Sequence, residues 1–356
     1  MLDGPRRGRG ATCNPAGRFE RTMREPFDDG WGTLEELAGA PAPVTEVRPD
    51  AARSVLTTNE SPDIGFDRSV NPYRGCEHGC IYCYARPSHA YLGLSSGLDF
   101  ETRIFAKHDA AALLRAELAR PGYVPDVLAL GSNTDPYQPV ERRLGITRAI
   151  LELLVETRHP FAITTKGAGV LRDIDLLEEA ARHGLARVAV SVTTLDRELA
   201  RKMEPRAAAP WRRLEAIRAL AAAGVPVGAN LSPLIPGLND HEIEQVAAAV
   251  AEAGASHLDW ILLRLPHEVK ELFAAWLEAH YPDRARRILS LLRQCRAGRL
   301  NDPRFGHRMR GSGPLADLLA QRVEKARRRF GLDRPPAPLR LDLFRPPRAD
   351  GQLSLF

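Results

Sequence analysis

The chain has 356 residues, enough to bury a substantial core in one large domain or two small ones. It contains no apolar run of about eighteen residues, and no apolar segment follows the basic residues Arg6, Arg7 and Arg9. Neither a transmembrane helix nor a secretory signal is therefore predicted, and a cytoplasmic protein is expected. The formal net charge of +5 suits a polyanionic partner, although the Arg- and Ala-rich composition of a GC-rich genome would give the same charge.

Residues 1–60 are rich in Gly, Pro and Arg with little periodicity, which predicts an irregular lead-in with a short helix near Leu34–Leu37. From 61 to 265, short β-type runs alternate with longer helical ones, the pattern of βα units and a parallel sheet. The predicted helices lie near 140–158, 172–184, 210–223 and 240–254. The predicted strands are Ser69–Tyr73, Val127–Leu130, Phe161–Thr165, Val188–Thr193, Val225–Leu231 and Trp260–Arg264. Beyond them we expect a helical extension over 266–332 and an extended Pro-rich tail over 333–356.

Six strands with intervening helices predict an α/β fold, either a partial (β/α)6 TIM-type barrel or a doubly wound sheet. Periodicity alone does not separate the two. In both, ligand sites lie in the loops at the carboxyl ends of the strands. Polar and special residues gather just there, in the segments 75–84, 131–138, 164–167, 191–194 and 230–240. One end of the sheet is therefore expected to carry an active site.

Three of the five cysteines follow the first predicted strand with the spacing C-x3-C-x2-C, at Cys76, Cys80 and Cys83. An odd count with a tight cluster favours metal ligation over a disulfide framework. A structural zinc site normally has four ligands; no second cysteine pair is present, but His78 or His89 could complete such a site. Alternatively, three thiolates would leave one iron of a 4Fe–4S cluster open to a chelating cofactor.

The motif C-x3-C-x-aromatic-C in the loop after the first strand of a βα barrel resembles the radical S-adenosylmethionine (SAM) superfamily. This resemblance implies the partial (β/α)6 barrel, with a 4Fe–4S cluster on Cys76, Cys80 and Cys83. It further implies that SAM chelates the open iron and that a one-electron reductant drives its cleavage to methionine and a 5′-deoxyadenosyl radical. The protein would then supply cluster ligation, orientation and exclusion of water.

The resemblance also implies which residues contact SAM. Tyr82 is placed against the adenine. The turn Gly131–Asp135 takes the position of the family's Gly-Gly-Glu motif, which is absent here, so its polar residues stand in as substitutes. The implied contacts besides Tyr82 are Ser132, Thr134 and Asp135, then Ser191 and Thr193 after the fourth strand and Asn230 and Ser232 on the fifth. Each of them could instead end a strand or cap a helix.

Two charged features nearby admit two interpretations. Glu204-Pro205-Arg206 after the fourth strand could position SAM or substrate, or form a helix end with a surface ion pair of little consequence. Lys166, after the third strand, could face the active site or solvent. For both we expect a role in the site.

Within the superfamily the chain most resembles the spore photoproduct lyase-like branch, also described as DNA-repair photolyase-like. The resemblance rests on the segments 71–76, 81–85, 132–138, 204–206 and 235–240. Tyr82 and Tyr84 match tyrosines around the radical relay of the lyase and are the catalytic candidates. The lyase needs a further cysteine near the end of the second strand, but no cysteine lies between Cys83 and Cys295. Repair of spore photoproduct by that mechanism is therefore not implied, and Tyr84 is the candidate to quench a substrate radical.

The last five residues, Gln352, Leu353, Ser354, Leu355 and Phe356, resemble the short peptide by which bacterial replication and repair proteins dock on the sliding clamp. A Gln and a Leu/Leu-Phe set suit one polar contact and apolar pockets. The alternative is an apolar tail that folds back onto the barrel. If the peptide does dock on DNA-bound clamp, the Arg-rich segment 304–310 could contact phosphates.

These features together predict a radical SAM enzyme that cleaves SAM reductively and acts on nucleic acid, in the manner of DNA repair. One alternative is radical modification of a peptide or small molecule. Another is a non-catalytic iron–sulfur or zinc protein that senses DNA. Cleavage of SAM separates the enzyme from the sensor, and salt-dependent DNA binding separates the two substrate classes.

Overall fold

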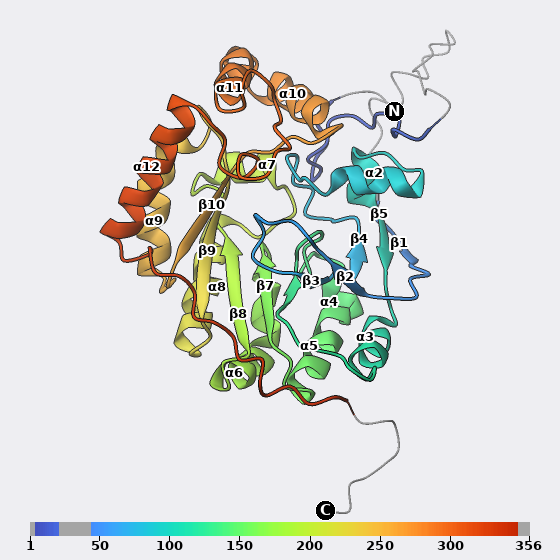
Figure 1. The fold of residues 1–356 in the computed structure, drawn as a ribbon. Coiled ribbons are helices and arrows are strands. Elements are labelled where there is room, and N and C mark those ends of the chain that lie inside the picture. The colour runs from blue at the N-terminus through green and yellow to red at the C-terminus, as the bar shows by residue number, and fades with distance from the viewer. Residues whose placement is uncertain (1–3, 21–43, 348–356) are drawn as a thin grey trace, which may run out of the picture.

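The computed structural model describes residues 4–20 and 44–347. Its centre is a seven-stranded sheet with the order β10-β9-β8-β7-β6-β3-β2 (Figure 1). Strands β3, β6, β7, β8, β9 and β10 run parallel, while β2 pairs antiparallel with β3 at one edge. Their bounds are β2 Leu56–Thr58, β3 Arg68–Val70, β6 Leu128–Leu130, β7 Phe161–Thr165, β8 Ala186–Ser191, β9 Val227–Leu234 and β10 Leu258–Leu262.

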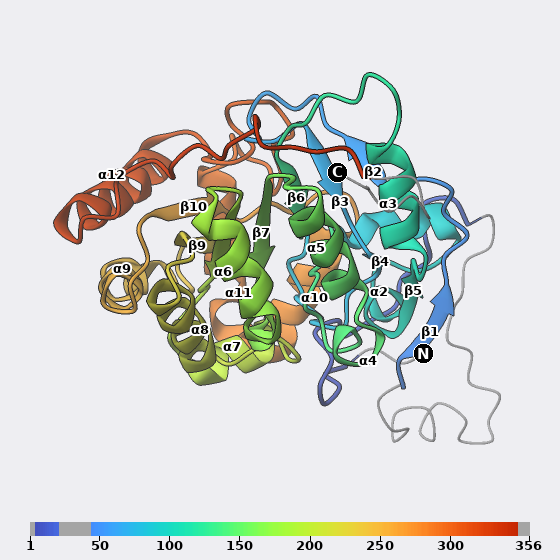
Figure 2. The same cartoon turned by 90° about the horizontal axis from the view of Figure 1, so that it is seen from below.

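The predicted partial (β/α)6 barrel is confirmed, because six parallel strands form an open sheet whose edge strands β10 and β2 do not pair with each other in the described part of the chain. The main helices line one face of this sheet rather than both, as Figure 2 shows, which argues against the doubly wound alternative. These helices are α5 Ile146–Glu156, α6 Ile174–Arg182, α8 Pro210–Ala222 and α9 Ile243–Glu252.

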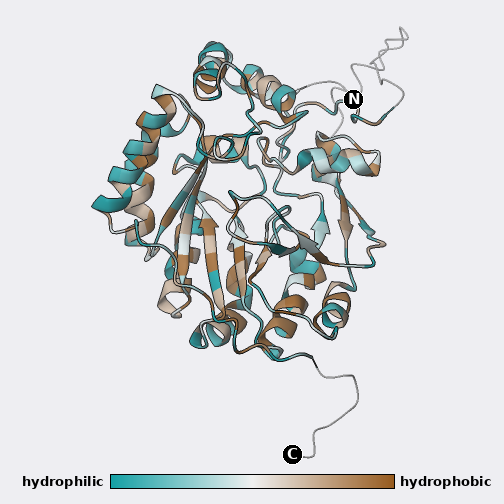
Figure 3. Cartoon of the chain, in the orientation of Figure 1, coloured by the Kyte–Doolittle hydropathy of each residue, from teal (hydrophilic) through white to brown (hydrophobic). Residues whose placement is uncertain are grey.

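The core lies between the sheet and these helices. Continuous apolar runs such as Leu128–Leu130 suit parallel strands, and Val188 and Val190 point into the same buried layer. On α5 the positions Ile150 and Leu154, four residues apart, are fully buried against it. Hydrophobic residues prevail in the strands, and hydrophilic ones along much of the outer helix α12 (Figure 3).

Shorter helices lie between the strands and the main helices. The helix predicted near 140–158 is two helices, α4 (Glu141–Leu144) and α5, because Gly145 between them has φ +65°. The regions predicted near 172 and 240 begin as short 3-10 helices, η2 (Ala168–Asp173) and η3 (Asp240–Glu242). A short helix that was not predicted, α7 (Arg197–Met203), follows β8 and is capped by the Asp196 side chain.

A second, three-stranded sheet lies beside the barrel with the order β1-β5-β4. The predicted strand Ser69–Tyr73 is divided between the two sheets: β3 ends at Val70, and β4 (Tyr73–Arg74) begins after Pro72, which has no N–H to donate to a ladder. The other strands, β1 (Glu46–Pro49) and β5 (Arg103–Ala106), were not predicted. Between β4 and β5 lie η1 (Arg86–Leu92) and α2 (Leu98–Thr102), and α3 (Ala110–Leu118) follows β5.

The predicted lead-in over 1–60 is, in its described parts 4–20 and 44–60, more regular than its composition indicated. It contains β1 and β2, and the segment Arg9–Thr12 is buried. The helix expected near Leu34–Leu37 lies outside the described residues.

The C-terminal extension is helical as predicted, with α10 (Val269–His280), α11 (Pro282–Gln294) and α12 (Pro314–Arg329). Helices α10 and α11 lie beyond the carboxyl ends of the strands, and α12 lies beside α9 (Figure 1). The tail then crosses the amino ends of the strands, where the Arg340 N–H donates to the Gly184 carbonyl at 2.9 Å and the Arg345 N–H to Thr157 at 2.8 Å. Residues 352–356 lie outside the described part. No described helix has the length and apolar character needed to cross a membrane.

Candidate active site

The cysteine loop connects β4 to η1 at the carboxyl end of the sheet. The Cys76 N–H donates to the Phe100 carbonyl at 2.9 Å, and the Ile81 N–H donates to Met203 at 3.0 Å, so backbone contacts fix both halves of the loop. Gly79 has φ +67°, and a Cβ there would lie 2.8 Å from a carboxylate oxygen of Glu101. The loop therefore requires glycine between its first two cysteines.

The three cysteine side chains lie in one enclosed environment. Cys76 and Cys80 are buried and Cys83 is largely buried. Burial raises the pKa of all three thiols. The charge of a neighbouring thiol or cationic group also contributes to each pKa. Within residues 4–20 and 44–347 no three His, Cys, Asp or Glu side chains lie close enough to hold one ion. Three thiols on one loop suit a cluster in which each thiolate takes a different iron, whereas a structural zinc site normally has four ligands around one ion.

Asp135 ties the cysteine loop to the ends of β6 and β7. Its carboxylate lies 3.3 Å from His78 Nδ1 and accepts hydrogen bonds from the Thr165 hydroxyl and the Lys166 N–H, both at 2.7 Å. Burial alone would raise the pKa of Asp135, but His78 and these hydrogen bonds lower it to about 2. Thr134 is buried and donates to the Tyr73 carbonyl at 3.0 Å. Both predicted SAM contacts thus make bonds within the protein.

A second buried network joins Tyr82 to the strand ends. The Tyr82 hydroxyl donates to Glu204, and the Thr193 hydroxyl donates to the same carboxylate oxygen at 2.6 Å. Arg213 forms a buried ion pair with the other Glu204 oxygen. Burial by itself would raise the pKa of Glu204, but Arg213, Lys166 and the two hydroxyls hold it below its ordinary value.

The segment Glu204-Pro205-Arg206 therefore contacts the cysteine loop and helps to fix its position. Besides the contacts of Glu204, Arg206 pairs with Glu77 at 3.0 Å and its N–H donates to the His78 carbonyl at 3.2 Å. The Lys166 ammonium lies 5.9 Å from the centre of the Tyr82 ring, so it faces the site. A merely superficial ion pair, the alternative considered for Glu204, does not describe this residue, which is 2% exposed.

The concave face of the sheet holds a cavity of about 490 Å³. Ser132, Asn230 and Ser232 line it near the carboxyl ends of the strands, and small residues such as Ala162 and Ala189 form its floor. Toward the amino ends the lining includes Arg187, His257, Asp259 and Arg310. Three predicted SAM contacts therefore share this cavity, whereas Ser191 is buried and does not line it.

Tyr84 stands at the upper end of this cavity. Its hydroxyl donates to the carbonyl of Ser132, a cavity residue, and its ring lies 5.5 Å from the guanidinium of Arg264. The side chain is half exposed, at 48%. Tyr84 is thus available to a ligand, while Tyr82 is enclosed in the Glu204 network.

The cavity is covered by two segments that meet across the open edges of the barrel. Asp63, before β3, forms an ion pair with Arg308 that includes hydrogen bonds of 2.7 and 3.0 Å. The neighbouring Met309 accepts a hydrogen bond from the Leu262 N–H of β10 at 2.9 Å. The segments 63–66 and 306–310 therefore link the β2 edge to the β10 edge.

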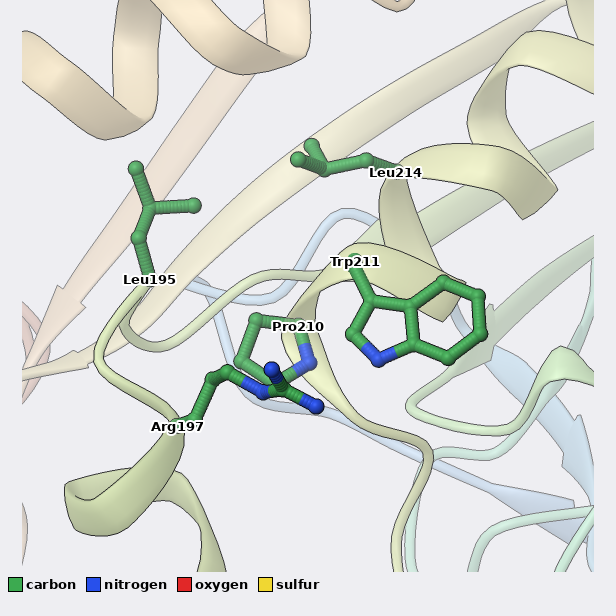
Figure 4. A pocket seen from close by; sticks show the side chains of 5 residues that line it. All are labelled: Leu195, Arg197, Pro210, Trp211 and Leu214. Carbon is green, nitrogen blue, oxygen red and sulfur yellow. The ribbon is translucent and has the colours of Figure 1, made fainter.

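Another pocket, of about 380 Å³, lies at the surface between α7 and α8. Figure 4 shows its lining, which is Leu195, Arg197, Pro210, Trp211 and Leu214. Arg197 is the single charged residue among these five. The concave cavity, beside the cysteine loop, is the better candidate for an active site.

The sequence interpretation missed two sets of residues that hold this site. Asn71 accepts the Asn133 N–H at 3.0 Å and donates to Ser132 at 3.1 Å, which fixes the turn after β6. Glu101 and Arg86 form a fully buried ion pair behind the cysteine loop. Asn71 lies in the segment that supported the family resemblance, but neither Glu101 nor Arg86 belongs to a motif.

Residues 70–250 match the family model described as the radical SAM superfamily. The chain belongs to this superfamily. An uncharacterised protein of Mycobacterium tuberculosis is 38% identical over 231 residues, which cover 64% of this chain and 68% of the relative. An uncharacterised protein of Methanocaldococcus jannaschii is 25% identical over 214 residues, covering 60% and 76%.

Among solved structures, spore photoproduct lyase complexed with dinucleoside spore photoproduct is similar in fold, with a TM-score of 0.57 and 17% identity over 80% of this chain and 78% of that one. A doubly substituted mutant of that lyase, solved with bound AdoMet and the dinucleoside, also has a TM-score of 0.57, with 16% identity over 87% and 85%. The predicted spore photoproduct lyase-like assignment is confirmed at the level of fold.

This radical SAM chain is therefore an enzyme of a family that uses a 4Fe–4S cluster and SAM. The residues present fit both groups: three enclosed thiols on one loop for the cluster, and a concave cavity beside it for SAM. When bound, the reduced cluster supplies the electron that cleaves the sulfonium of SAM. The chain's own contribution is to orient the cysteines, through Asp135 and Glu204, and to enclose the site.

Proposed function

We propose that this enzyme ligates its cluster through Cys76, Cys80 and Cys83, cleaves SAM reductively, and acts on nucleic acid in the cytoplasm. The observation that carries the substrate class is a set of arginines without ion-pair partners at the concave cavity. Two of them, Arg187 and Arg310, line the cavity itself, and Arg264 stands over the Tyr84 ring at its upper end.

None of these three arginines forms an ion pair within the described part of the chain. Arg310 donates to the Trp260 carbonyl and stacks 4.5 Å from the Trp260 ring, and Arg264 donates to the Met309 sulfur at 3.5 Å. Burial lowers the pKa of all three, although the charge of Asp259 partly offsets this for Arg187 and Arg310. Enclosed guanidinium groups that form no ion pair within the described residues are suited to a phosphate ligand.

The similarity of fold to spore photoproduct lyase agrees with this substrate class, since that protein has been solved with a dinucleoside lesion. The chemistry must differ at one point, however. The turn after β6 reads Gly131-Ser132-Asn133, and no cysteine lies between Cys83 and Cys295 to return a hydrogen atom. We propose Tyr84 for that role, because its side chain is half exposed and its hydroxyl donates to the carbonyl of Ser132, which lines the cavity.

For SAM itself we propose direct contacts from Ser132, Asn230 and Ser232, which share the cavity. Tyr82 and Thr193 would act through the Glu204 network beneath it, and Thr134 and Asp135 through the fixed cysteine loop. Ser191 contributes its carbonyl to Arg213, at 3.1 Å, and so supports the same network.

The test is binding of a single-stranded oligonucleotide, followed by fluorescence anisotropy over a series of salt concentrations. We expect Arg187→Ala and Arg310→Ala each to weaken binding and to reduce the slope of log K against log salt by about 0.7 per lost phosphate contact. Arg212→Ala is the matched control, because Arg212 is a surface residue paired with Glu215. Binding that is unchanged in both cavity variants would contradict a nucleic-acid substrate and favour a peptide or small molecule.

A second proposed partner is the bacterial sliding clamp, through Gln352–Phe356. Its support is the resemblance of these residues to clamp-docking peptides. The described tail reaches Pro347 and is held to the barrel at Arg345, near the packing of Phe344 on His159. Substituting Leu355 and Phe356 by Ala should abolish clamp binding in size-exclusion chromatography; unaltered co-elution would refute the docking role.

A further inference from the structure

The segment Arg9-Gly10-Ala11 lies directly behind the cysteine loop, although some seventy residues separate the two in sequence. A Cβ on Gly10 would lie 1.8 Å from the Gly79 carbonyl oxygen and 3.4 Å from the Ile81 nitrogen. Ala11 is fully buried. Two backbones thus meet at Gly10 with no space for a side chain, and the contact falls between the first two cysteines of the loop.

Glu101 connects the backbone of Gly10 and Ala11 to Arg86, which in turn contacts the cysteine loop. Its carboxylate is fully buried and accepts the Gly10 N–H at 3.0 Å and the Ala11 N–H at 2.7 Å. The same carboxylate pairs with Arg86 at 2.5 Å. A buried carboxylate that accepts two backbone N–H groups and a guanidinium is fully compensated, and removing any one of these partners would leave the buried charge less well compensated.

Arg86 carries the contact on to the cysteine loop. Its Nε donates to the Cys80 carbonyl at 2.8 Å, and Nη2 donates to the Gly79 carbonyl at 3.1 Å. Nη1 donates to the carbonyls of Ser96 and Gly97 at 3.1 and 2.9 Å. All five N–H groups of the guanidinium therefore have an acceptor, so Arg86 holds the loop carbonyls in one arrangement.

We propose that Arg9, whose guanidinium donates to the Glu101 carbonyl at 3.0 Å, forms a positioning brace for the iron–sulfur cluster together with Gly10, Ala11, Glu101 and Arg86. The brace fixes the backbone of Gly79 and Cys80 from the side away from the cavity, and the buried segment keeps water from the back of the loop. These residues touch neither SAM nor substrate. Their role is to hold the cysteine ligands, in the way that outer-shell contacts orient metal ligands elsewhere. This inference rests on the proposed ligation by Cys76, Cys80 and Cys83.

The test compares Gly10→Ala and Glu101→Gln with the full-length wild type after anaerobic reconstitution with iron and sulfide. Gly169→Ala is the control for the glycine, since its new Cβ would meet only ordinary contacts at 3.6 Å. Glu244→Gln is the control for the glutamate, because Glu244 pairs with Arg322 at the surface. The readouts are bound iron and sulfide, the electron paramagnetic resonance signal of the reduced cluster with and without SAM, and the rate of cluster loss in air.

We expect both brace variants to lose the cluster in air about tenfold faster or more, the order of magnitude by which outer-shell changes weaken metal sites. Their resonance signals should broaden or shift, while the two controls match wild type. Both changes also disturb a buried contact and should lower the melting temperature of the iron-free protein, so cluster loss is compared at a temperature where circular dichroism shows every iron-free variant still folded, which places the defect at the cluster. Cluster lifetimes and signals equal to wild type would overturn the proposal, and so would a loss of melting temperature in the iron-free variants that accounts for the whole effect.

Failure of the brace is distinguishable from failure of the proposed ligation. If Cys80→Ala still bound a complete cluster, the ligand assignment itself would be wrong. If Cys80→Ala lost the cluster while Gly10→Ala and Glu101→Gln kept it unchanged, the ligand assignment would be supported and the proposed brace would be refuted.

Discussion

Arg213→Met removes the cation that forms a buried ion pair with Glu204 in the core of the site. Arg213 is 1% exposed, and besides the ion pair it donates to the Ala208 carbonyl at 2.7 Å and the Ser191 carbonyl at 3.1 Å. In the variant, Glu204 keeps its hydroxyl donors from Tyr82 and Thr193 and the charge of Lys166, but loses its ion-pair partner. Removing one partner of a buried ion pair costs about 3–5 kcal/mol, because the other charge stays buried without compensation.

The free energy of unfolding can be measured by urea titration of the iron-free protein under reducing conditions, followed by near-ultraviolet circular dichroism. The matched control is Arg322→Met, which breaks the partly exposed pair with Glu244 and should cost about 0–1 kcal/mol. The double variant Arg213→Met/Glu204→Met should recover part of the loss, since it removes both charges. A cost for Arg213→Met no larger than for Arg322→Met would refute the reasoning that this pair is a buried support of the site.

Two further predictions concern the cover and the frame of the cavity. Hydrogen bonding to Arg308 lowers the pKa of Asp63, so this pair stabilises the fold above the ordinary aspartate pKa of about 3.9 and loses its effect as the pH falls through the folded-state pKa. Asp63→Asn should therefore lower the melting temperature at pH 7, with a difference from wild type that shrinks below about pH 4; a difference independent of pH would contradict this. Gly131→Ala, at φ +88° with its Cβ 2.1 Å from the Thr164 carbonyl, should cost more in urea unfolding than Gly122→Ala, which has φ +79° but open space around it. An equal loss of unfolding free energy in the two variants would show that the close contact at Gly131 does not affect stability.

The sequence predicted the features that depend on local patterns. The buried strand Phe161–Thr165 was predicted with its observed bounds, since a short apolar run between helical segments is read without knowledge of its neighbours. The cysteine loop was placed correctly at the carboxyl end of the sheet for the same reason. The division of the first strand at Pro72 and the second sheet were missed, because β1 and β5 pair across more than fifty residues and carry no periodic signal of their own.

The functional roles of single side chains were less predictable. Asp135 was identified as a polar residue at a strand end, but only the structure shows that it bonds to His78 and to the backbone of Lys166. Gly10 lies in a segment whose composition predicts irregular chain, and its fit against Gly79 arises from a contact between distant parts of the sequence. Composition reports the conformations available to a segment, whereas burial depends on what packs against it.

The measurement that most directly tests the account is formation of 5′-deoxyadenosine after anaerobic reconstitution with iron and sulfide and addition of dithionite and SAM. Wild type should form 5′-deoxyadenosine, and Cys80→Ala should form none, because it lacks one of the three proposed ligands of the cluster. A wild-type protein that takes up an intact cluster yet never cleaves SAM would contradict the central claim.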